Sequence, residues 1–326
     1  MKVLILNKRE VESMLSMPAC IELMETALAS LARGEVMLPL RPVMRIPDSP
    51  NVFALMPAYS ASLKAIGTKF ITVFPGNHGT TMDSHQGAML LIDGERGNVL
   101  AMMDAASITA IRTAAVSAVA TRLLARRDAR TLAILGAGVQ GRTHLAAMLV
   151  ARSFTTVRVW SRDPARARAL ADDAARRGLA ASATSDAEGA VRGADVVCTV
   201  TAAREPVLLG DWLAPGVHVN AVGASMPNAR ELDTGAVLRA RVFVDRRESA
   251  LNEAGDILIP MNEGAFTADH IVAEIGELLA GKAQGRRDDH DITLFKSLGL
   301  AVEDLACAHY LHDRANHHGV GTWVEF

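Results

Sequence analysis

A glycine-rich turn near the middle of the chain has the residue types and spacing that bind a dinucleotide. Gly136, Gly138 and Gly141 follow a short apolar run and precede a helix-like segment. Gly136 permits the tight turn, Gly138 lets the backbone approach phosphates, and Gly141 lets the helix pack closely on the strand. Unpaired N–H groups at the helix start would face the pyrophosphate. Glycine triplets also make ordinary turns, but the flanking strand and helix favour a dinucleotide site that includes Val139 and Gln140.

Three cationic side chains stand where they could bind an acid. Arg45 lies in the strand-like VMRIP, Lys69 in the apolar AIGTKFITVFP, and Arg112 in the small-residue helix ITAIRTAAV. A lysine in so apolar a strand must find a partner or lose its charge. Three such cations suit an anionic substrate, most simply a carboxylate. Two structural alternatives stay open: Lys69 on a half-exposed sheet face, and Arg112 in an internal ion pair, for example with Asp104.

The cations belong to a region that reads as a sheet with flanking helices. We expect a strand at Lys2 to Leu6 and an amphipathic helix from Ser16 to Arg33, where apolar residues recur at helical spacing. From Leu40 to Leu100, short apolar runs separated by turn residues predict an antiparallel sheet, whose clearest hairpin is AMLLID-GERG-NVLAMMD. A long helix from Asp104 to Leu124 then leads into the glycine turn.

From Arg130 to near Asp245 strands and helices alternate, which predicts a parallel sheet covered by helices on both faces. The predicted strands are TLAILG, TVRVWS, VVCTVT, VHVNAVG and RVFVD, with a weaker one near Ala180, and the helices follow Gly141, Pro164, Asp186 and Leu232. Two further helices are expected at Thr267 to Ala280 and Leu300 to Asn316. The final GTWVEF reads as a strand that returns to the first sheet.

The expected fold class is therefore α/β, with a Rossmann doubly wound parallel sheet plus a discontinuous α+β domain. We place the dinucleotide-binding domain at residues 121–299 and the other domain at 1–120 and 300–326.

Composition and charge exclude some classes of function. Half of the 326 residues are hydrophobic and the formal net charge is −2, without the basic surplus that nucleic-acid binding requires. The pairs Arg126-Arg127 and Arg286-Arg287 stand beside acids and are predicted to be solvated surface. No stretch has the length and apolarity of a membrane span, and the N-terminus lacks the pattern of a signal peptide.

The three cysteines, Cys20, Cys198 and Cys307, are few, odd in number and far apart. They predict buried thiols in a reducing compartment, and with the points above a cytoplasmic protein. No CxxC pair is present, and no metal site is expected.

The end of the second Rossmann strand distinguishes the two nicotinamide coenzymes. The chain reads Val159-Trp160-Ser161-Arg162-Asp163 there. An acid at this position binds both ribose hydroxyls and repels a 2′-phosphate, whereas an arginine pairs with that phosphate. We assign Ser161 and Arg162 to the phosphate, with Arg166 as a helper, and expect NADP(H) to be preferred, with NAD(H) possible. The alternative is that Arg162 is an exposed helix-start residue and Asp163 takes the ribose.

Five segments in order resemble the ornithine cyclodeaminase/μ-crystallin family. They are Ser84-His85-Gln86-Gly87, the run from Asp104 to Thr113, GAGVQGRTH, NAVGAS at Asn220 to Ser225, and TLFKSLG at Thr293 to Gly299. The resemblance covers nearly the whole chain and is far more specific than the glycine motif alone. It implies a discontinuous substrate-binding and dimerisation domain, a Rossmann domain, a homodimer, and nicotinamide chemistry at an amino-acid α-carbon or its imine.

The same resemblance implies roles for single residues. Arg45, Lys69 and Arg112 fall on the positions that hold the substrate carboxylate in this family. Lys69 would donate or position a proton, and Ser225 would orient the ring nitrogen or a water. His85 is a weaker candidate, because a histidine at a strand start is more often structural. The residues expected to line the coenzyme are Thr113, Thr201, Val222 and Ser297.

One departure separates subgroups of the family. Where ornithine cyclodeaminases carry an aspartate after the fifth strand, this chain reads Gly223-Ala224-Ser225. Serine has no negative charge and is a poor base at neutral pH, so the chain resembles the cyclic ketimine reductases more than the cyclodeaminases. The structural alternative for Ser225 is a turn residue that caps Pro227 to Arg230.

The leading hypothesis is an NADPH-dependent reductase of a cyclic imino acid. The expected substrates are Δ1-pyrroline-2-carboxylate, which gives L-proline, and Δ1-piperideine-2-carboxylate, which gives L-pipecolate. The main enzymatic alternative is an NAD-dependent ornithine cyclodeaminase, and an acyclic amino-acid dehydrogenase is a third possibility. An alternative from another class is a non-catalytic NADPH-binding protein like μ-crystallin.

Overall fold

The computed structural model describes residues 2–77, 80–82 and 84–325, and the chain divides into two compact units. One unit holds Met1–Arg112 with Gly299–Phe326, and the other holds Thr113–Leu298. We call the first the sheet unit and the second the Rossmann unit. The boundary falls inside helix α3 (Ala105–Leu124), earlier in the chain than the predicted boundary after residue 120.

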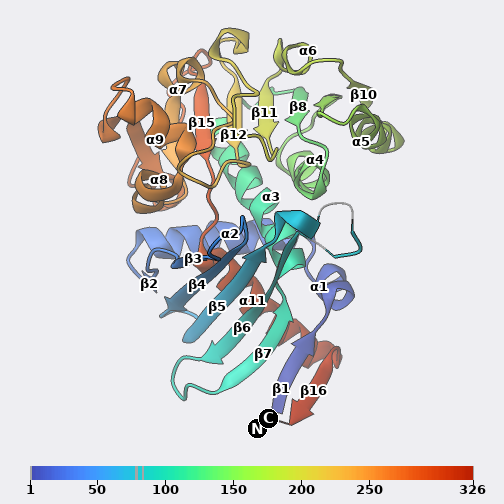
Figure 1. The fold of residues 1–326 in the computed structure, drawn as a ribbon, viewed down its shortest axis with the longest axis vertical. Helices are drawn as coiled ribbons and strands as arrows, with labels where there is room; N and C mark the ends of the chain where they lie inside the picture. Colours follow the sequence, from blue (N-terminus) through green and yellow to red (C-terminus); the bar gives the residue numbers. More distant parts are fainter. Residues whose placement is uncertain (1, 78–79, 83, 326) are drawn as a thin grey trace. The chain divides into compact units, whose positions relative to one another are not determined.

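The sheet unit is built on a mixed sheet with strand order β16-β1-β7-β6-β5-β4-β2, and β3 pairs with β4 (Figure 1). Its strands are β1 (Lys2–Leu6), β2 (Val36–Met37), β3 (Val43–Arg45), β4 (Val52–Ser60), β5 (Ala65–Val73), β6 (His85–Asp93), β7 (Val99–Asp104) and β16 (Thr322–Glu325). Its helical segments are α1 (Lys8–Met14), α2 (Met17–Ala32), the 3-10 turn η1 (Pro75–Asn77), the start of α3, and α11 (Ala301–His318). The hairpin of β6 and β7 is confirmed, and β16 pairs antiparallel with β1, which confirms the return of the last strand.

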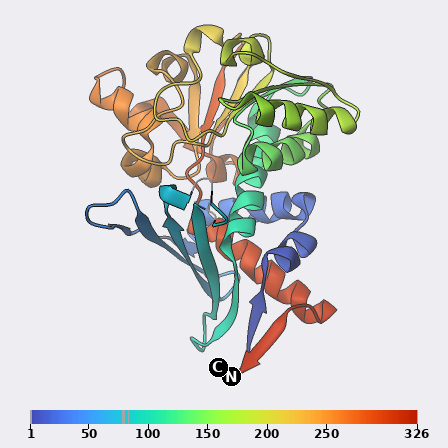
Figure 2. The ribbon, with the colours of Figure 1, turned by 45° about the vertical axis from the view of Figure 1, so that its right-hand side comes forward.

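Alternation along the strands gives this sheet one buried face. In β4, Ala54 and Met56 are buried whereas Leu55 between them is exposed, and in β5 Lys69 is buried. Successive side chains of a strand point to opposite faces, so these buried residues share one side of the sheet. Helix α11 packs across β4 to β7 on that side, and α2 packs against α11 (Figure 2). The alternation of side chains along β5 therefore places Lys69 on the face that α11 covers.

The opposite face of the same sheet is apolar and partly exposed. Phe53 and Phe70 stack there with ring centroids 6.5 Å apart. Leu55 and Met102 are 37% and 41% exposed. Apolar surface of this kind, gathered on one face, is typical of a surface that another protein covers.

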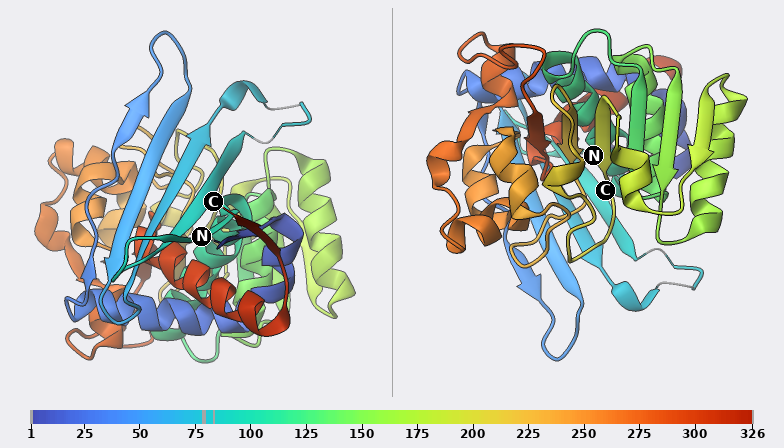
Figure 3. Two further views of the ribbon diagram at one scale, coloured as in Figure 1. Left: turned by 90° about the horizontal axis from the view of Figure 1, so that it is seen from below. Right: turned by 90° about the horizontal axis from the view of Figure 1, so that it is seen from above.

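The Rossmann unit is a parallel sheet with strand order β10-β9-β8-β11-β12-β15-β13-β14. Its strands are β8 (Thr131–Leu135), β9 (Thr156–Trp160), β10 (Ala180–Ala183), β11 (Val196–Thr199), β12 (His218–Ala221), β13 (Arg241–Val244), β14 (Ile271–Glu274) and β15 (Thr293–Lys296). Its helical segments are α4 (Val139–Ala151), α5 (Pro164–Arg176), α6 (Ala187–Val191), η2 (Gly210–Trp212), α7 (Thr234–Arg239), α8 (Arg247–Glu253), α9 (Gly255–Asn262), η3 (Ala268–His270) and α10 (Ile275–Leu279), with the rest of α3. Figure 3 shows helices on both sides of these strands, as the alternating pattern predicts.

Successive side chains of the central strand β12 point to opposite faces of the sheet and so contact different helices. Val219 and Ala221 belong to an apolar core that also holds buried residues of α6 to α9. Asn220 points to the other face, where its Nδ2 donates to Oγ1 of Thr121 in α3 at 2.9 Å. The central strands β11, β12 and β15 are buried at every residue, as expected for a parallel sheet that is covered on both faces.

The segment Thr267 to Ala280 corrects one prediction. It is not a single helix, but the short turn η3, the edge strand β14 and the five-residue helix α10. Ile271 and Ile275 stand at helical spacing, yet residues Ile271 to Glu274 pair in parallel with β13. Sheet pairing therefore overrides the helical pattern. Helices α8 and α9 and strand β15 were not predicted.

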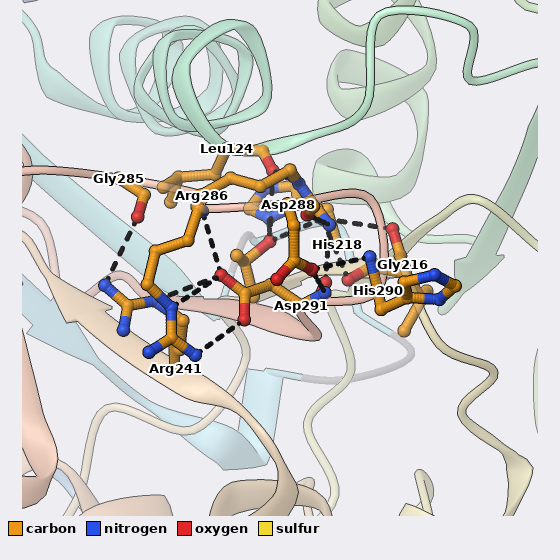
Figure 4. A network of polar contacts seen from close by, with 12 residues as sticks. Leu124, Gly216, His218, Arg241, Gly285, Arg286, Asp288, His290 and Asp291 are labelled. Atoms are coloured by element: carbon orange, nitrogen blue, oxygen red, sulfur yellow. Dashed lines mark hydrogen bonds and ion pairs between the residues drawn. The ribbon is translucent and has the colours of Figure 1, made fainter.

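The prediction of solvated arginines is wrong for Arg286. Its guanidinium is half-buried and donates to the carbonyl oxygens of Leu124 (2.6 Å) and Gly216 (3.0 Å) and to Oγ1 of Thr293 (3.1 Å). Figure 4 shows this network, which ties the end of α3 to the turns that precede β12 and β15. Its neighbour Arg287 is exposed, as predicted.

The three thiols are buried and unbridged, as predicted. Sγ of Cys20 lies 3.7 Å from Sγ of Cys307.

Within the described ranges, no single helix is long and apolar enough to span a membrane. Helices α1 and α2 pass that test of length and composition only as a pair, and a bend of 83° separates them.

Candidate functional site

The glycine turn has the geometry that the motif predicts. Gly136 has φ +112°, and a Cβ there would lie 2.7 Å from the Val200 carbonyl oxygen. A Cβ on Gly141 would lie 2.2 Å from the Gly136 carbonyl oxygen, so the start of α4 packs directly on the turn. Both positions therefore require glycine.

The start of α4 is open to a ligand. Its N-cap residue, Gly138, provides no side-chain cap, and a Cβ at Gly138 would meet no atom within 4 Å. The first N–H groups of a helix need acceptors, and a phosphate supplies them where no side chain does. By contrast, Asp163 caps α5 through the N–H groups of Ala165 and Arg166.

The predicted coenzyme-lining residues gather at one edge of the parallel sheet. Gly136 follows β8, Thr201 follows β11, Val222 follows β12 and Ser297 follows β15, and these four strands are neighbours. Because the strands are parallel, their carboxyl ends lie at the same edge. The chain leaves β8 for β9 on one side and resumes with β11 on the other, which is the switch point where doubly wound sheets bind ligands.

Two buried polar atoms support this placement. Oε1 of Gln140, in the first turn of α4, and Oγ of Ser297 have no hydrogen-bond partner among the described residues. Buried polar groups are nearly always hydrogen-bonded. An unpaired polar atom near the carboxyl edge of the sheet therefore suits a hydrogen bond to a bound ligand. Val139, beside Gln140, is exposed, and Thr113 is buried at the start of the Rossmann part of α3.

The residues assigned to a 2′-phosphate follow β9. Ser161 is half-buried and Arg162 is exposed. Arg166 is also exposed, and its Nε lies 3.3 Å from Oδ2 of Asp163. Asp163 thus caps the start of α5 and pairs with Arg166.

Two of the residues predicted to bind the substrate, Lys69 and Arg112, meet in the sheet unit. Nζ of Lys69 lies 2.8 Å from Oδ2 of Asp304 and 3.1 Å from Oγ1 of Thr109. Arg112 donates from Nε to Oδ1 of Asp304 at 3.1 Å and from Nη1 to Oε2 of Glu303 at 2.9 Å. The four charged side chains are at most 4% exposed. We call Lys69, Arg112, Glu303 and Asp304 the charge cluster.

Within the charge cluster, the two predicted substrate-binding cations are already paired with acids. Two cations face two carboxylates, so the cluster is formally neutral and is not a bare positive pocket. The internal ion pair considered for Arg112 exists, but its partners are Glu303 and Asp304. Asp104, the partner named from the sequence, instead accepts from the Ser107 N–H at 2.8 Å and so holds the start of α3.

Burial and pairing set the proton affinities of the cluster. Burial lowers the pKa of Lys69 to about 8, with Arg112 and Arg41 adding to the effect and Asp304 opposing it. Burial alone would lower the pKa of Arg112, but Asp304 and Glu303 outweigh it and raise that pKa. Burial would raise the pKa of Asp304, yet Arg112 and Lys69 hold it below its ordinary value. Lys69 is therefore charged at neutral pH and close to its titration.

Arg45 and Arg41 differ in a way that the sequence did not suggest. Arg45 ends strand β3 and is exposed. Arg41 is half-buried, its Nη2 donates to the Gly299 carbonyl oxygen at 3.4 Å, and its charge helps to lower the pKa of Lys69. Arg41 therefore lies near the charge cluster, whereas no hydrogen bond or ion pair among the described residues joins Arg45 to it.

Ser225 lies exposed in the segment after β12. No hydrogen bond from its hydroxyl to Pro227 to Arg230 is described, so the structure does not support a capping role. Its role toward a ligand stays a prediction. The backbone of His85 begins β6, but its side chain lies outside what the structure describes.

Several members of the site were missed from the sequence, namely Arg41, Thr109, Glu303 and Asp304. The acidic pair had a usable signal, because it interrupts the apolar run LGLAVEDLACA and buried acids need partners. Thr109 stands three residues before Arg112 and so shares its helix face. Arg41 had no signal that distinguishes it from Arg45.

A parallel sheet with an open glycine turn at its switch point defines a dinucleotide-binding protein. A family model described as the ornithine cyclodeaminase/mu-crystallin family matches residues 1–319. The chain belongs to the ornithine cyclodeaminase/mu-crystallin family.

Named relatives make the likeness more specific. The ketimine reductase mu-crystallin of Mus musculus is 43% identical over 293 residues, which span 89% of this chain and 90% of the mouse protein. A Thermococcus litoralis Delta(1)-pyrroline-2-carboxylate reductase, solved with NADH and L-proline, has a TM-score of 0.95 and 38% identity over 98% of this chain and 99% of its own. An archaeal alanine dehydrogenase dimer with bound NAD has a TM-score of 0.96 and 32% identity over the whole of both chains.

Proposed function

We propose that this protein is an NAD(P)H-dependent reductase of cyclic imino acids. Its substrates are Δ1-pyrroline-2-carboxylate, reduced to L-proline, and Δ1-piperideine-2-carboxylate, reduced to L-pipecolate. The observation that carries the proposal is the buried Lys69, which is ion-paired beside Arg112 and has a pKa of about 8. Relatives at 38% and 43% identity that are named as pyrroline-2-carboxylate and ketimine reductases support the same chemistry.

The charge cluster has donors left to hold a substrate carboxylate. A guanidinium carries five N–H donors, and the two acids engage Arg112 through Nε and Nη1. An ammonium carries three, and Lys69 directs two at Asp304 and Thr109, which leaves one N–H for the imine nitrogen while the charge of Lys69 attracts the carboxylate. A bound carboxylate would leave the neutral cluster with a net negative charge. We therefore propose that Arg41 supplies the additional positive charge, and Arg45 stays a second candidate.

Lys69 is the proton donor in this proposal. The imine nitrogen takes a proton from Nζ of Lys69, because an iminium accepts hydride better than a neutral imine does. When bound, the reduced nicotinamide supplies the hydride to C2, and the C=N π electrons become the lone pair on nitrogen. Asp304 holds Nζ in place on one side and Thr109 on the other. Lys69 then regains its proton from water. Ser225 is proposed to orient the ring nitrogen or a water.

The proposed coenzyme preference is NADP(H). The glycine turn, with Gly136, Gly138 and Gly141, would hold the pyrophosphate, and Arg162 with Ser161 would meet the 2′-phosphate. Arg166 would help only after giving up its exposed ion pair with Asp163, and such pairs contribute about 1 kcal/mol or less. Relatives are solved with NADH or NAD, so a nicotinamide coenzyme is shared and the choice of phosphate is the proposal.

We also propose that two copies of the chain associate through the exposed apolar face of the mixed sheet. Phe53, Phe70, Leu55 and Met102 lie on this face. A related alanine dehydrogenase is a dimer, which supports the proposal.

The assay that tests the function combines the protein with NADPH and Δ1-pyrroline-2-carboxylate. We expect coenzyme oxidation with formation of L-proline, and a higher kcat/KM with NADPH than with NADH. The control reaction combines L-ornithine with NAD. Ammonia release from ornithine without net coenzyme turnover would replace the reductase with a cyclodeaminase. Tight NADPH binding without turnover of either imine would favour a non-catalytic binder.

The ionisation of Lys69 predicts the pH dependence. We expect kcat/KM for the imine to fall as pH rises through about 8, because the ammonium form both attracts the carboxylate and donates the proton. The corresponding decrease in kcat should occur at a higher pH, because a bound carboxylate stabilises the ammonium form of Lys69. Lys69→Arg keeps the charge at every pH tested and should lose this pH dependence together with about 100-fold in kcat. A decrease at the same pH in the Lys69→Arg enzyme would assign the titration to the substrate or to another group.

Arg41 and Arg45 form a matched pair of variants. Arg41→Gln should raise KM for the imine by about 10-fold or more, since a charge-assisted hydrogen bond contributes about 1.5–3 kcal/mol. Arg45→Gln should change KM by less than about twofold, because an exposed charge contributes little. Steady-state kinetics at saturating coenzyme measure both. The reverse pattern would give the carboxylate contact to Arg45.

The association of two copies is tested by the mass in solution. Light scattering at micromolar concentration should give twice the mass of the chain. Leu55→Asp should shift the protein to a monomer, because it places a charge in the apolar interface. Leu238→Asp is the matched control, since Leu238 is 46% exposed on α7 of the Rossmann unit. A monomeric wild type, or an unchanged dimer in Leu55→Asp, would contradict the proposal.

A further inference from the structure

A single buried carboxylate joins two loops at the carboxyl edge of the Rossmann sheet. Glu231 lies between β12 and α7 and is fully buried. Its Oε1 accepts from the backbone N–H and the hydroxyl of Thr201 at 2.6 and 2.7 Å. Its Oε2 accepts from the Gly223 N–H at 2.7 Å and from the Thr199 hydroxyl at 2.8 Å. One oxygen thus serves the loop after β11, and the other serves the loop after β12 together with the last residue of β11.

The two loops approach too closely for any side chain to separate them. A Cβ on Gly223 would lie 2.1 Å from the Thr201 carbonyl oxygen and 2.5 Å from Oε1 of Glu231. Both distances are shorter than non-bonded atoms allow. Gly223 is therefore required for the loops to share the carboxylate.

Glu231 is itself fixed by a second buried acid. Oδ1 of Asp256, in α9, accepts from the N–H groups of Glu231 at 2.7 Å and Leu232 at 3.0 Å. Oδ2 of Asp256 pairs with Nζ of Lys296 at 2.8 Å, and neither side chain is exposed. Lys296 ends β15 and directly precedes Ser297. The ends of β11, β12 and β15 thus belong to one hydrogen-bonded assembly.

We propose that Glu231 is a positioning residue that sets where Thr201 and the segment 222–225 meet the nicotinamide half of the coenzyme. The inference rests on the proposed function for the reaction it serves. It goes beyond that function by assigning the alignment of the ring to a residue that touches neither coenzyme nor substrate.

The donor pattern makes Glu231→Gln a sharp test. All four partners of the carboxylate present N–H or O–H groups, and only the hydroxyls can reverse their role. A glutamine offers one oxygen and one NH2 group. Its NH2 group must face the N–H of either Thr201 or Gly223. One loop is then released, whichever way the amide turns.

The expected signature separates alignment from affinity. The adenine and phosphate half of the coenzyme meets the glycine turn and residues 161–166, which Glu231 does not touch. Glu231→Gln should leave the Kd for NADPH within about threefold and lower kcat for the imine by about 10-fold or more, because catalysis depends on the geometry of approach. The deuterium isotope effect with 4-deuterated NADPH should increase. Emission from the bound dihydronicotinamide should also change.

Thr199→Val is the matched control. It removes one partner of the same carboxylate, but that partner lies in the strand β11 and both loop N–H bonds remain. We expect a lower Tm with kcat and the isotope effect within about twofold of wild type, as for a buried hydrogen bond without a role in alignment.

Gly223→Ala is the second test and decides the matter if Glu231→Gln does not fold. It pushes the loops apart while the carboxylate stays, and it should reproduce the loss of kcat at nearly constant Kd. The inference is overturned if Glu231→Gln has the kcat and the isotope effect of the wild type. If Glu231→Gln does not fold, the same result in Gly223→Ala overturns it. An equal kinetic loss in Thr199→Val would also overturn it. If the wild type reduces no imine, the proposed function fails, and the emission of bound NADPH in the same variants still tests the alignment.

Discussion

The pairing of Lys69 with Asp304 is the interaction on which the sheet unit depends. A fully buried ammonium is costly unless a carboxylate meets it, and removing one partner of such a pair costs about 3–5 kcal/mol. Asp304 meets two cations at once, Lys69 from β5 and Arg112 from α3. Because Asp304 lies on α11, this one carboxylate joins the last helix of the chain to strand β5 and helix α3, which lie about 200 residues or more earlier in the sequence. The discontinuous fold of the unit and the charge cluster thus have the same physical basis.

Buried charges in the Rossmann unit are also satisfied by partners from distant segments. Two of its buried acids, Glu231 and Asp256, lie under the loops at the carboxyl edge of the sheet. Asp256 is paired with Lys296, whereas Glu231 is satisfied by four neutral donors. Burial and the charge of Asp256 raise the pKa of Glu231, while Lys296 and the Thr201 donors oppose that rise. In both units, charges that interrupt the apolar interior hold segments distant in sequence.

The neutrality of the charge cluster bears directly on the proposed reaction. A pocket of three bare cations would bind an acid tightly but would be costly to bury. Paired cations fix the geometry beforehand, and the acidic substrate then needs only the remaining donors and one more nearby charge, for which Arg41 is placed. Burial lowers the pKa of Lys69 to about 8 while Asp304 opposes that decrease, so Lys69 stays charged at neutral pH and suits a group that must give up a proton.

The sequence by itself determined the elements with strong local patterns. The glycine turn, the alternating strands and helices, the β6–β7 hairpin and the return of the last strand could all be predicted, because periodicity and turn chemistry act over short ranges. The segment Thr267 to Ala280 could not, since pairing with β13 decided it. The sequence also identified Lys69 and Arg112 as unusual. Only the tertiary structure decided that Glu303 and Asp304 are their partners, that Arg41 rather than Arg45 lies near them, and that Glu231 joins two loops. Those contacts link residues far apart in the chain, and no local pattern encodes which buried charge will meet which.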